Sequence, residues 1–385
     1  MTDPLVTRMR PYGETIFSTM SALARRHDAV NLGQGFPDTD GPGEVLEAAR
    51  RAIAGGHNQY PPGQGVPSLR SAIADHQRER YGIELDPGSE VLVTAGATEA
   101  IASALLALLE AGDEVVTFEP YYDSYAAGIS LAGGVQRSVP LSFPGPGFDR
   151  ERLAAAFSER TKVVLLNTPH NPLGKVFTRE ELTVVADLAR EHDAWVVSDE
   201  VYEHMTYDDA VHVPIATLPG MAERTLTIGS AGKAFSVTGW KIGWISGPER
   251  LVSAVTTVKQ YLTFTTTSPL QHAVAEALRL GPTVFEELTS SLAMRRDLLV
   301  DGLTSAGFDV SVPQGTYFVV ADAAPLGVTD AVQWSLELPE SVGVVGVPVS
   351  VFCDTPDETA SLVRFAFCKQ EDKLREACRR LATMG

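Results

Sequence analysis

Between residues 91 and 246 the chain alternates short apolar runs with amphipathic stretches, and this alternation restricts the fold more than any other feature. The apolar runs have the length of strands, and the stretches between them repeat their apolar residues with a helical period. Such alternation is typical of βα units around a largely parallel sheet, so we predict an α/β fold. The expected strands and helices are residues 91–94, 98–109, 114–118, 122–131, 162–166, 180–191, 195–198, 226–229 and 242–246.

After residue 246 the pattern changes to long helices and then to a mixture of strands and helices. Helical periodicity covers 249–261, 269–280 and 285–306, strand-like runs follow at 316–321 and 362–367, and a last helix is expected at 372–384. We predict a large domain over residues 41–290 and a small C-terminal α+β domain over residues 291–385. An N-terminal segment, residues 1–40, is expected to pack on the small domain, because the Pro- and Gly-rich run 33–43 is typical of a crossover loop.

The composition excludes several classes of protein. With 44% hydrophobic and 21% charged residues in a chain of 385, disorder is not expected. A formal net charge of −18 argues against a surface for nucleic acid or anionic membranes. Three cysteines form no CxxC pair, and no segment has the length and apolar character of a signal peptide or a membrane span. We therefore expect a cytoplasmic protein and predict no metal site.

Lys233 lies in a turn rich in small residues, within the run from Gly229 to Trp244, between two apolar strands. A partly desolvated lysine has a lowered pKa and forms a Schiff base with a carbonyl compound. A solvated loop lysine is the alternative. The glycines and serines around it favour the first interpretation, because they allow close approach of the backbone to a bulky anion, and Lys241 adds a second positive charge.

Two loops that follow predicted strands are candidates for ligand binding. The run from Thr94 to Ala100 turns from a strand into an apolar helix through Gly96, which places N–H groups where they would form an anion cradle. On this run alone, a plain strand-to-helix turn is the favoured interpretation. The run from Asn167 to Gly174 is a polar loop at the carboxyl end of a strand, where open α/β sheets bind ligands. A tight Asn-Pro turn would explain that run equally well.

Two further strands carry charged residues. Asp199 ends the strand 195–198 and is followed by Tyr202; it either caps a helix or pairs with a buried cation. Arg364 lies in the strand 362–367 on the same face as apolar neighbours. A buried guanidinium needs a carboxylate, which is supplied either by the protein itself or by a ligand.

Together these segments resemble the class I/II aminotransferases of fold type I, which use pyridoxal 5′-phosphate (PLP), and the resemblance runs from Asn31 to Arg364. It implies a large domain with a mostly parallel seven-stranded sheet, and a homodimer with shared active sites. Segments 33–37, 58–60, 198–204 and 349–353 are similar to the branch of kynurenine, glutamine and methionine aminotransferases. Segments 10–12, 58–63 and 221–225 are similar to actinobacterial N-succinyldiaminopimelate aminotransferases.

The resemblance also implies roles for individual residues. Lys233 would bind the cofactor covalently and later move the proton from Cα, and Asp199 would pair with the pyridine nitrogen. Tyr202, together with Asn171, would hydrogen-bond the phenolate oxygen of the cofactor. The expected cofactor contacts are Ala97, Thr98, Tyr122, Asn171, Asp199, Tyr202, Ser230, Lys233 and Lys241, with Tyr60 supplied by a neighbouring subunit. The substrate carboxylate would be bound by Arg364, Asn171 and Gly35. The substrate side chain is expected to contact Tyr12, Ile16, Gln34, Phe264 and Phe352.

The expected activity is transfer of the α-amino group of an L-amino acid to a 2-oxo acid by ping-pong chemistry, with 2-oxoglutarate and glutamate as the second couple. Candidate donors are N-succinyl-LL-diaminopimelate, kynurenine, glutamine, methionine and aromatic amino acids. A PLP-dependent C–S β-lyase acting on cystathionine is the alternative, because the same carbanion loses a leaving group from Cβ. A non-enzymatic PLP-binding regulator ranks last, since too few residues precede Gly33 for a basic DNA-binding domain.

Overall fold

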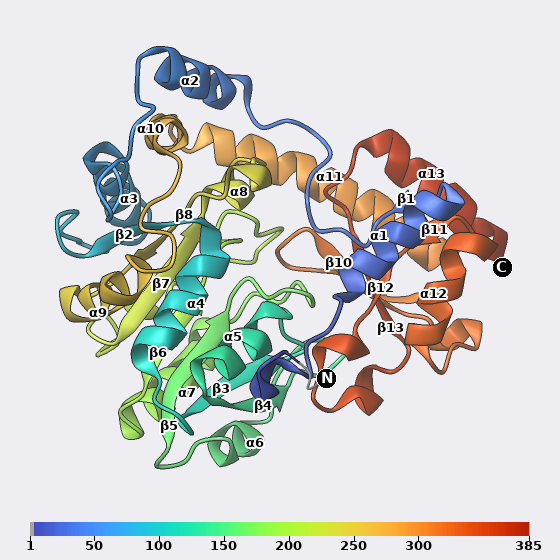
Figure 1. Ribbon diagram of the computed structural model, residues 1–385. Helices are drawn as coiled ribbons and strands as arrows, with labels where there is room; N and C mark the ends of the chain where they lie inside the picture. Colours follow the sequence, from blue (N-terminus) through green and yellow to red (C-terminus); the bar gives the residue numbers. More distant parts are fainter. Residues whose placement is uncertain (1–3, 385) are drawn as a thin grey trace.

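A computed structural model describes residues 4–384. Its central feature is a seven-stranded sheet with the order β2-β8-β7-β6-β5-β3-β4 (Figure 1). Only β8 in this sheet runs antiparallel to its neighbours, so the predicted α/β fold with a mostly parallel sheet is confirmed. The strands are β2 (Val91–Thr94), β3 (Glu114–Glu119), β4 (Val135–Pro140), β5 (Thr161–Asn167), β6 (Trp195–Asp199), β7 (Thr225–Ser230) and β8 (Gly243–Ser246).

One of these strands, β4, was not predicted from the sequence. It lies at the edge of the sheet and pairs only with β3, and its side chains alternate between exposed and partly buried along most of its length. An edge strand that faces solvent needs few apolar residues, so its polar sequence gives no strong hydrophobic signal. The other six strands agree with the predicted segments to within one or two residues at each end, because their apolar side chains are almost all buried.

Helices cover both faces of this sheet, and local sequence signals mark where several of them begin. Pro67 occupies the first turn of α3, where a proline is favoured. Thr178 and Glu181 form a capping box at the start of α7. Between residues 4 and 384, no helix is long and apolar enough to cross a membrane. The helices of this part are α2 (Gly43–Ala54), α3 (Pro67–Tyr81), α4 (Gly96–Leu108), α5 (Ser124–Ala132), α6 (Arg150–Ala155), α7 (Arg179–Glu191), α8 (Ala231–Ala234), α9 (Glu249–Lys259) and α10 (Ser268–Ala277).

The rest of the chain forms two small sheets that stand beside the large one (Figure 1). In the first sheet, β12 (Val347–Pro348), β13 (Leu362–Ala366), β10 (Phe318–Asp322) and β9 (Asp309–Ser311) lie in that order; the second pairs β1 (Val30–Asn31) with β11 (Val344–Val345). The N-terminal helix α1 contacts α12. Helix α11 is continuous across residue 290, and the domain boundaries remain a prediction. The helices are α1 (Ile16–His27), α11 (Thr283–Ser305), α12 (Ala331–Ser341) and α13 (Glu371–Leu381).

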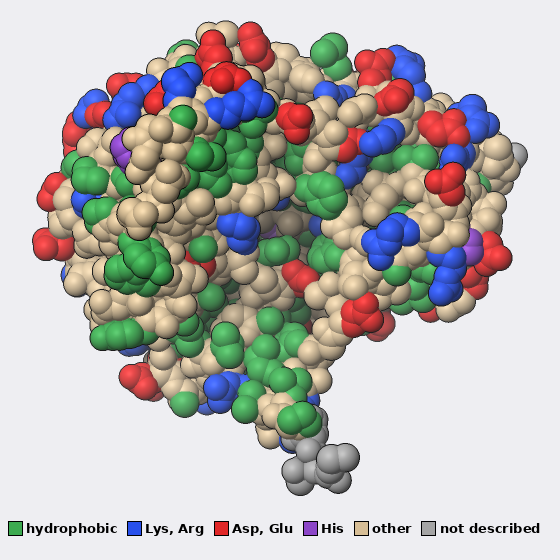
Figure 2. Space-filling model, turned by 45° about the horizontal axis from the view of Figure 1, so that its top comes forward, with side chains coloured by type: hydrophobic (Ala, Val, Ile, Leu, Met, Phe, Trp, Pro, Cys, Tyr) green, Lys and Arg blue, Asp and Glu red, His purple; other side chains and the backbone are tan. Residues whose placement is uncertain are grey.

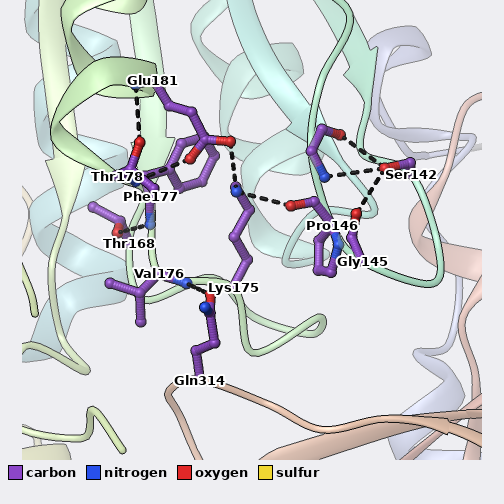
Figure 3. Close-up of polar contacts among 11 residues, drawn as sticks. Ser142, Gly145, Pro146, Thr168, Lys175, Val176, Phe177, Thr178, Glu181 and Gln314 are labelled. Atoms are coloured by element: carbon purple, nitrogen blue, oxygen red, sulfur yellow. Dashed lines mark hydrogen bonds and ion pairs between the residues drawn. The ribbon is translucent and has the colours of Figure 1, made fainter. Parts of the chain in front are cut away.

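The loop between β5 and α7, which carries Asn171, is held in place by a buried lysine (Figure 3). The Lys175 ammonium donates to the backbone oxygen of Pro146 at 2.8 Å and to the Glu181 carboxylate at 2.7 Å. Glu181 also closes the capping box of α7, so one carboxylate joins the loop to the start of the helix. A buried charge with both an ionic and a backbone partner fixes the loop geometry. Asn171 therefore has a defined position above the sheet.

Candidate active site

A cavity of about 300 Å³ lies at the carboxyl ends of the parallel strands, against residues of β10 and β13. Figure 2 shows a hollow between the larger and smaller parts of the molecule. Ligand sites of open α/β sheets occur at this edge. Every predicted cofactor contact except Tyr60, and every residue predicted to bind the substrate carboxylate, lines the cavity: Gly35, Ala97, Thr98, Tyr122, Asn171, Asp199, Tyr202, Ser230, Lys233, Lys241 and Arg364.

Lys233 enters the cavity from α8, the single turn of helix that follows β7. Its amine donates to the hydroxyl of Tyr317 at 2.5 Å and approaches the backbone oxygen of Gly35 at 3.4 Å. Burial lowers the pKa of this amine to about 8. Much of it is therefore neutral in mildly alkaline solution, which is the state in which a lysine is nucleophilic.

Asp199 lies at the end of β6 and is 4% exposed. Its carboxylate accepts hydrogen bonds from the Tyr125 hydroxyl and, at 3.4 Å, from the Val201 N–H. Burial raises its pKa to about 6. The helix-cap interpretation is wrong, because a turn and not a helix follows. Among the described residues no cation lies within ion-pair distance of this carboxylate, so a cationic ligand would compensate its buried charge.

The start of α4 forms an anion cradle together with a lysine from the β8 side. Gly96 has a φ of +77°, and a Cβ added there would lie 3.1 Å from the Lys241 amine. At Gly243, an added Cβ would come within 2.6 Å of the Gly96 backbone. These two glycines bring Lys241 close to the N–H groups at the start of α4, where Thr98 and Ser230 also line the cavity. A helix N-terminus with a nearby ammonium is suited to a phosphate group.

Arg364 projects from β13 and is 2% exposed. Its two terminal nitrogens donate to the Asn171 side chain at 3.1 Å and to the backbone oxygen of Gly33 at 2.9 Å, whereas its Nε has no partner. No carboxylate of the described residues forms an ion pair with it, and burial lowers its pKa to about 10. A buried guanidinium with an unused donor that faces a cavity is suited to a ligand carboxylate.

Four aromatic residues of the cavity region were missed at the sequence level. Tyr317 contacts Lys233 and lies edge-on to the Tyr202 ring, with 5.3 Å between centroids. Tyr125 holds Asp199, and Phe17 and Phe318 line the cavity beside Arg364. The available signals were weak: Tyr317 and Phe318 stand at the start of a predicted strand, and Tyr125 lies one turn after two tyrosines in a predicted helix.

Of the residues predicted to contact the substrate side chain, Gln34 lines the cavity and the others lie elsewhere. The Tyr12 hydroxyl donates to the backbone of Ala126 at 2.9 Å, and Phe352 is buried against Phe17. Ile16 packs in the same apolar cluster as Phe352, and Phe264 is 49% exposed. Phe264 is in ring contact with Tyr60, which is 86% exposed and lies outside the cavity of its own chain.

Comparison with known proteins identifies the family that has this arrangement. A model described as "Aminotransferase class I and II" matches residues 27–381. The chain belongs to this family. The aminotransferase is 50% identical, over 99% of its length and 98% of the relative's, to "Probable N-succinyldiaminopimelate aminotransferase DapC" of Mycobacterium tuberculosis. It is 40% identical to the methionine aminotransferase of Escherichia coli, over 98% of both chains.

Solved structures agree with this membership. The N-succinyldiaminopimelate aminotransferase from Mycobacterium tuberculosis has a TM-score of 0.97 at 50% identity, covering 99% of this aminotransferase and 100% of that chain. A double mutant of Thermus thermophilus aspartate aminotransferase has a TM-score of 0.90 at 36% identity, with both chains fully covered. The protein is a PLP-dependent aminotransferase of fold type I. The predicted family, fold, cofactor and enzyme class are confirmed, and nothing supports the β-lyase alternative.

The cavity fits PLP chemically. Its anion cradle at Gly96 suits a phosphate, its buried carboxylate at Asp199 suits a protonated ring nitrogen, and its amine at Lys233 suits an aldehyde. These three groups come from α4, β6 and α8, which the parallel sheet brings together at one edge.

Proposed function

We propose that Lys233 is the attachment point of PLP and that Asp199 neutralises its ring nitrogen. PLP supplies an electron sink for the charge left on the substrate Cα. The proposed phosphate contacts are the N–H groups of Ala97 and Thr98, the Ser230 hydroxyl and the Lys241 ammonium. Tyr122 is proposed to stack on the ring, with Asn171 and Tyr202 at its phenolic oxygen. This proposal is supported by the fact that all these residues line one cavity.

Arg364 is proposed to bind the α-carboxylate of the amino acid, with Asn171 and the backbone of Gly35 beside it. The observation that carries this role is the unpartnered Nε of a buried guanidinium that borders the same cavity as Lys233. A two-point contact with a carboxylate restricts rotation of the substrate about its Cα. The Cα–H bond is thereby held near the Lys233 amine.

Lys233 is further proposed to move the proton of the substrate, because a neutral amine is required for this step and burial already lowers its pKa to about 8. Tyr317 accepts a hydrogen bond from this amine and donates one to the Gly35 backbone at 2.6 Å. Because the Tyr317 hydroxyl donates its hydrogen to Gly35, its oxygen lone pair is oriented toward the Lys233 amine. Tyr317 therefore acts as a positioning residue for the lysine.

For the amino donor we propose N-succinyl-LL-diaminopimelate, with 2-oxoglutarate as the acceptor. The support is the 50% identity, over nearly the whole of both chains, to the relative named for that substrate. Large neutral amino acids such as methionine and kynurenine are the second candidate. They are favoured by the apolar cavity side chains of Phe17, Ile101 and Phe318, with Arg364 the only arginine among its described lining residues.

A panel of donors tests this proposal. N-succinyl-LL-diaminopimelate, methionine, kynurenine and glutamine would each be assayed with 2-oxoglutarate, and kcat/KM for the first is expected to exceed the others by about 10-fold or more. A higher value for methionine or kynurenine would support the second candidate. If no donor converts the bound cofactor to its amine form, measured by its absorbance, the proposed site itself is wrong.

A homodimer is proposed as the working assembly, since Tyr60 is exposed at a surface that also includes Tyr261 and Phe264. Exposed aromatic clusters of this kind favour contact with another protein surface.

The cytoplasm is the proposed compartment, because all three cysteines are free.

A further inference from the structure

A second polar cluster lies next to the segment that carries Asp199 and Tyr202. It consists of His76 from α3 and of Glu203 and His204 from the turn that follows β6. The side chains are 9%, 5% and 2% exposed, respectively. One ligand atom from each residue lies within 4.8 Å of the others. Two imidazoles and a carboxylate thus converge on one point away from bulk solvent.

The contacts within this cluster are longer than ordinary hydrogen bonds. The Nε2 atom of His76 lies 3.6 Å from Glu203 Oε2, and the Nε2 atom of His204 lies 3.7 Å from Glu203 Oε1. Both distances exceed the range of hydrogen bonds, roughly 2.7–3.2 Å. Glu203 Oε2 and His76 Nε2 have no other partner. Leaving a buried carboxylate oxygen without a partner at hydrogen-bond distance is costly, and a bound cation would remove that cost. The Tyr81 side chain is a further polar neighbour of Glu203.

A neighbouring pair shows what a satisfied contact looks like in the same region. His212 Nε2 lies 2.8 Å from Glu200 Oε2, and the other oxygen of Glu200 accepts from Ser198 at 2.7 Å. Glu200 is therefore fully paired, although it is as buried as Glu203. The longer separations around Glu203 are thus a property of that cluster and not of this part of the fold.

The separations suit a metal ion better than a proton. Two ligands bound to tetrahedral Zn²⁺ at about 2.0–2.1 Å are about 3.3 Å apart. His76 lies 3.6 Å from Glu203 Oε2 and His204 lies 3.7 Å from Glu203 Oε1, and one ligand atom of each residue lies within 4.8 Å of the others, so the side chains stand slightly farther apart than the ligands of a bound ion. Two histidines and one glutamate are a ligand set that Zn²⁺ uses in proteins, with the fourth position left to water. His204 is also held by its surroundings, since its ring stacks on Phe285 at 3.7 Å and its backbone oxygen accepts from Thr289 at 2.6 Å.

We propose that His76, Glu203 and His204 form a Zn²⁺ site with a structural role. The ion would join α3 to the turn after β6, and Phe285 and Thr289 would connect that turn to α11. Since Asp199 and Tyr202 lie on the same short segment as two of the ligands, the bound metal fixes the backbone that carries them. No metal motif is visible in the sequence, because His76 comes from a helix far from the other two ligands along the chain.

The test is the metal content of the untagged PLP-loaded enzyme, measured by plasma mass spectrometry after incubation with Zn²⁺ and gel filtration. About one zinc per chain is expected, together with a higher Tm that falls when a chelator removes the metal. In Co²⁺-loaded enzyme, visible d–d absorption of a tetrahedral site is expected at wavelengths where PLP does not absorb. A zinc content below about a tenth of an ion per chain would overturn the proposal and leave the cluster a purely polar contact.

Variants of two of the proposed ligands and of control histidines test which residues bind the zinc. His76→Gln and His204→Gln are expected to lower zinc affinity at least about tenfold and to abolish the Co²⁺ spectrum. His212→Gln is the matched buried control and is expected to retain one zinc. The rings of His57 and partly buried His272 lie 3.8 Å apart and are a second histidine pair that zinc would bind, so His272→Gln is a further control. Zinc that is retained by both ligand variants, or lost with His272→Gln, would overturn the assignment.

Discussion

The hydroxyl oxygen of Tyr317 lies 2.5 Å from the amine nitrogen of Lys233 and 2.6 Å from the backbone oxygen of Gly35. The tyrosine thus connects the proposed catalytic base to the segment proposed to border the substrate carboxylate. Tyr317 follows a residue with a φ of +67°, Thr316, at the entry to β10. The contact to Lys233 places Tyr317 beside the proposed catalytic base.

Tyr317→Phe is expected to lower kcat about 10-fold with little change in KM, because the lysine amine loses its hydrogen-bond acceptor and its orientation. The pH profile of kcat should also shift, since a hydroxyl that accepts from an ammonium stabilises the charged form. Tyr207→Phe is the control: its hydroxyl is also buried and bonded to a backbone oxygen, but the hydrogen bond from the Lys233 amine goes to Tyr317. An unchanged pH profile in the Tyr317 variant would contradict the positioning role.

Lys233→Ala is expected to remove covalent attachment of PLP and to lower turnover by about 10²–10⁴-fold. Borohydride reduction followed by peptide mass spectrometry measures the attachment directly. Lys241→Ala separates charge from attachment, because it is expected to weaken cofactor affinity while leaving Lys233 able to react. Label recovered on any lysine other than 233 in the wild-type enzyme would refute the assignment.

Arg364→Lys is expected to raise KM for the amino donor by about 10–100-fold, because an ammonium cannot reproduce a two-point contact with a carboxylate. The affinity for PLP, measured by absorbance titration, should change little, since Arg364 is proposed to contact the substrate. A variant that loses cofactor affinity but keeps its KM would show that the guanidinium has another role.

Asp199→Asn is expected to change the pH dependence of stability of the PLP-free protein. Its pKa of about 6 in the folded state lies above the ordinary 3.8, so between these pH values the folded state retains a proton that the unfolded state has lost. The free energy of unfolding is therefore higher below pH 3.8 than at neutral pH, and this difference is lost as the pH rises to about 6. Relative to wild type, the variant should gain about 3 kcal/mol in free energy of unfolding between pH 3.5 and 7.

The same variant should bind PLP more weakly, because an amide cannot neutralise the ring cation. Urea unfolding at several pH values measures the first effect, and absorbance titration with PLP measures the second. Equal stability differences between variant and wild type at pH 3.5 and 7 would contradict the buried ionised carboxylate.

Tyr60→Ala and Lys233→Ala chains are each expected to be nearly inactive alone and to recover activity when mixed and re-associated. In the hybrid dimer both substitutions fall in one active site if Tyr60 serves the site of the other chain, so the second site is intact. Subunit exchange followed by activity measurement tests this. Mixtures that stay inactive, although exchange is shown by native mass spectrometry, would contradict a shared site.

Residues close together along the chain largely determined what could be predicted from the sequence. The strand–helix alternation gave the sheet, and the turns at Gly96, Asn171, Asp199 and Lys233 each follow a strand, so their convergence at one edge follows from parallel strand direction alone. The polar edge strand β4 was not predicted, because a strand with alternating exposure leaves little hydrophobic signal in the sequence.

Contacts between distant segments were decided only by the tertiary structure. Tyr317 reaches Lys233 from β10, Tyr125 reaches Asp199 from α5, and His76 reaches Glu203 from α3. In the sequence these residues cannot be distinguished from ordinary core or surface residues, because burial and hydrogen bonding depend on which elements pack together. The sequence by itself determined the fold, the cofactor class and the cavity residues that follow strands, while packing of the small sheets against the large one decided which aromatic and ionisable groups surround them.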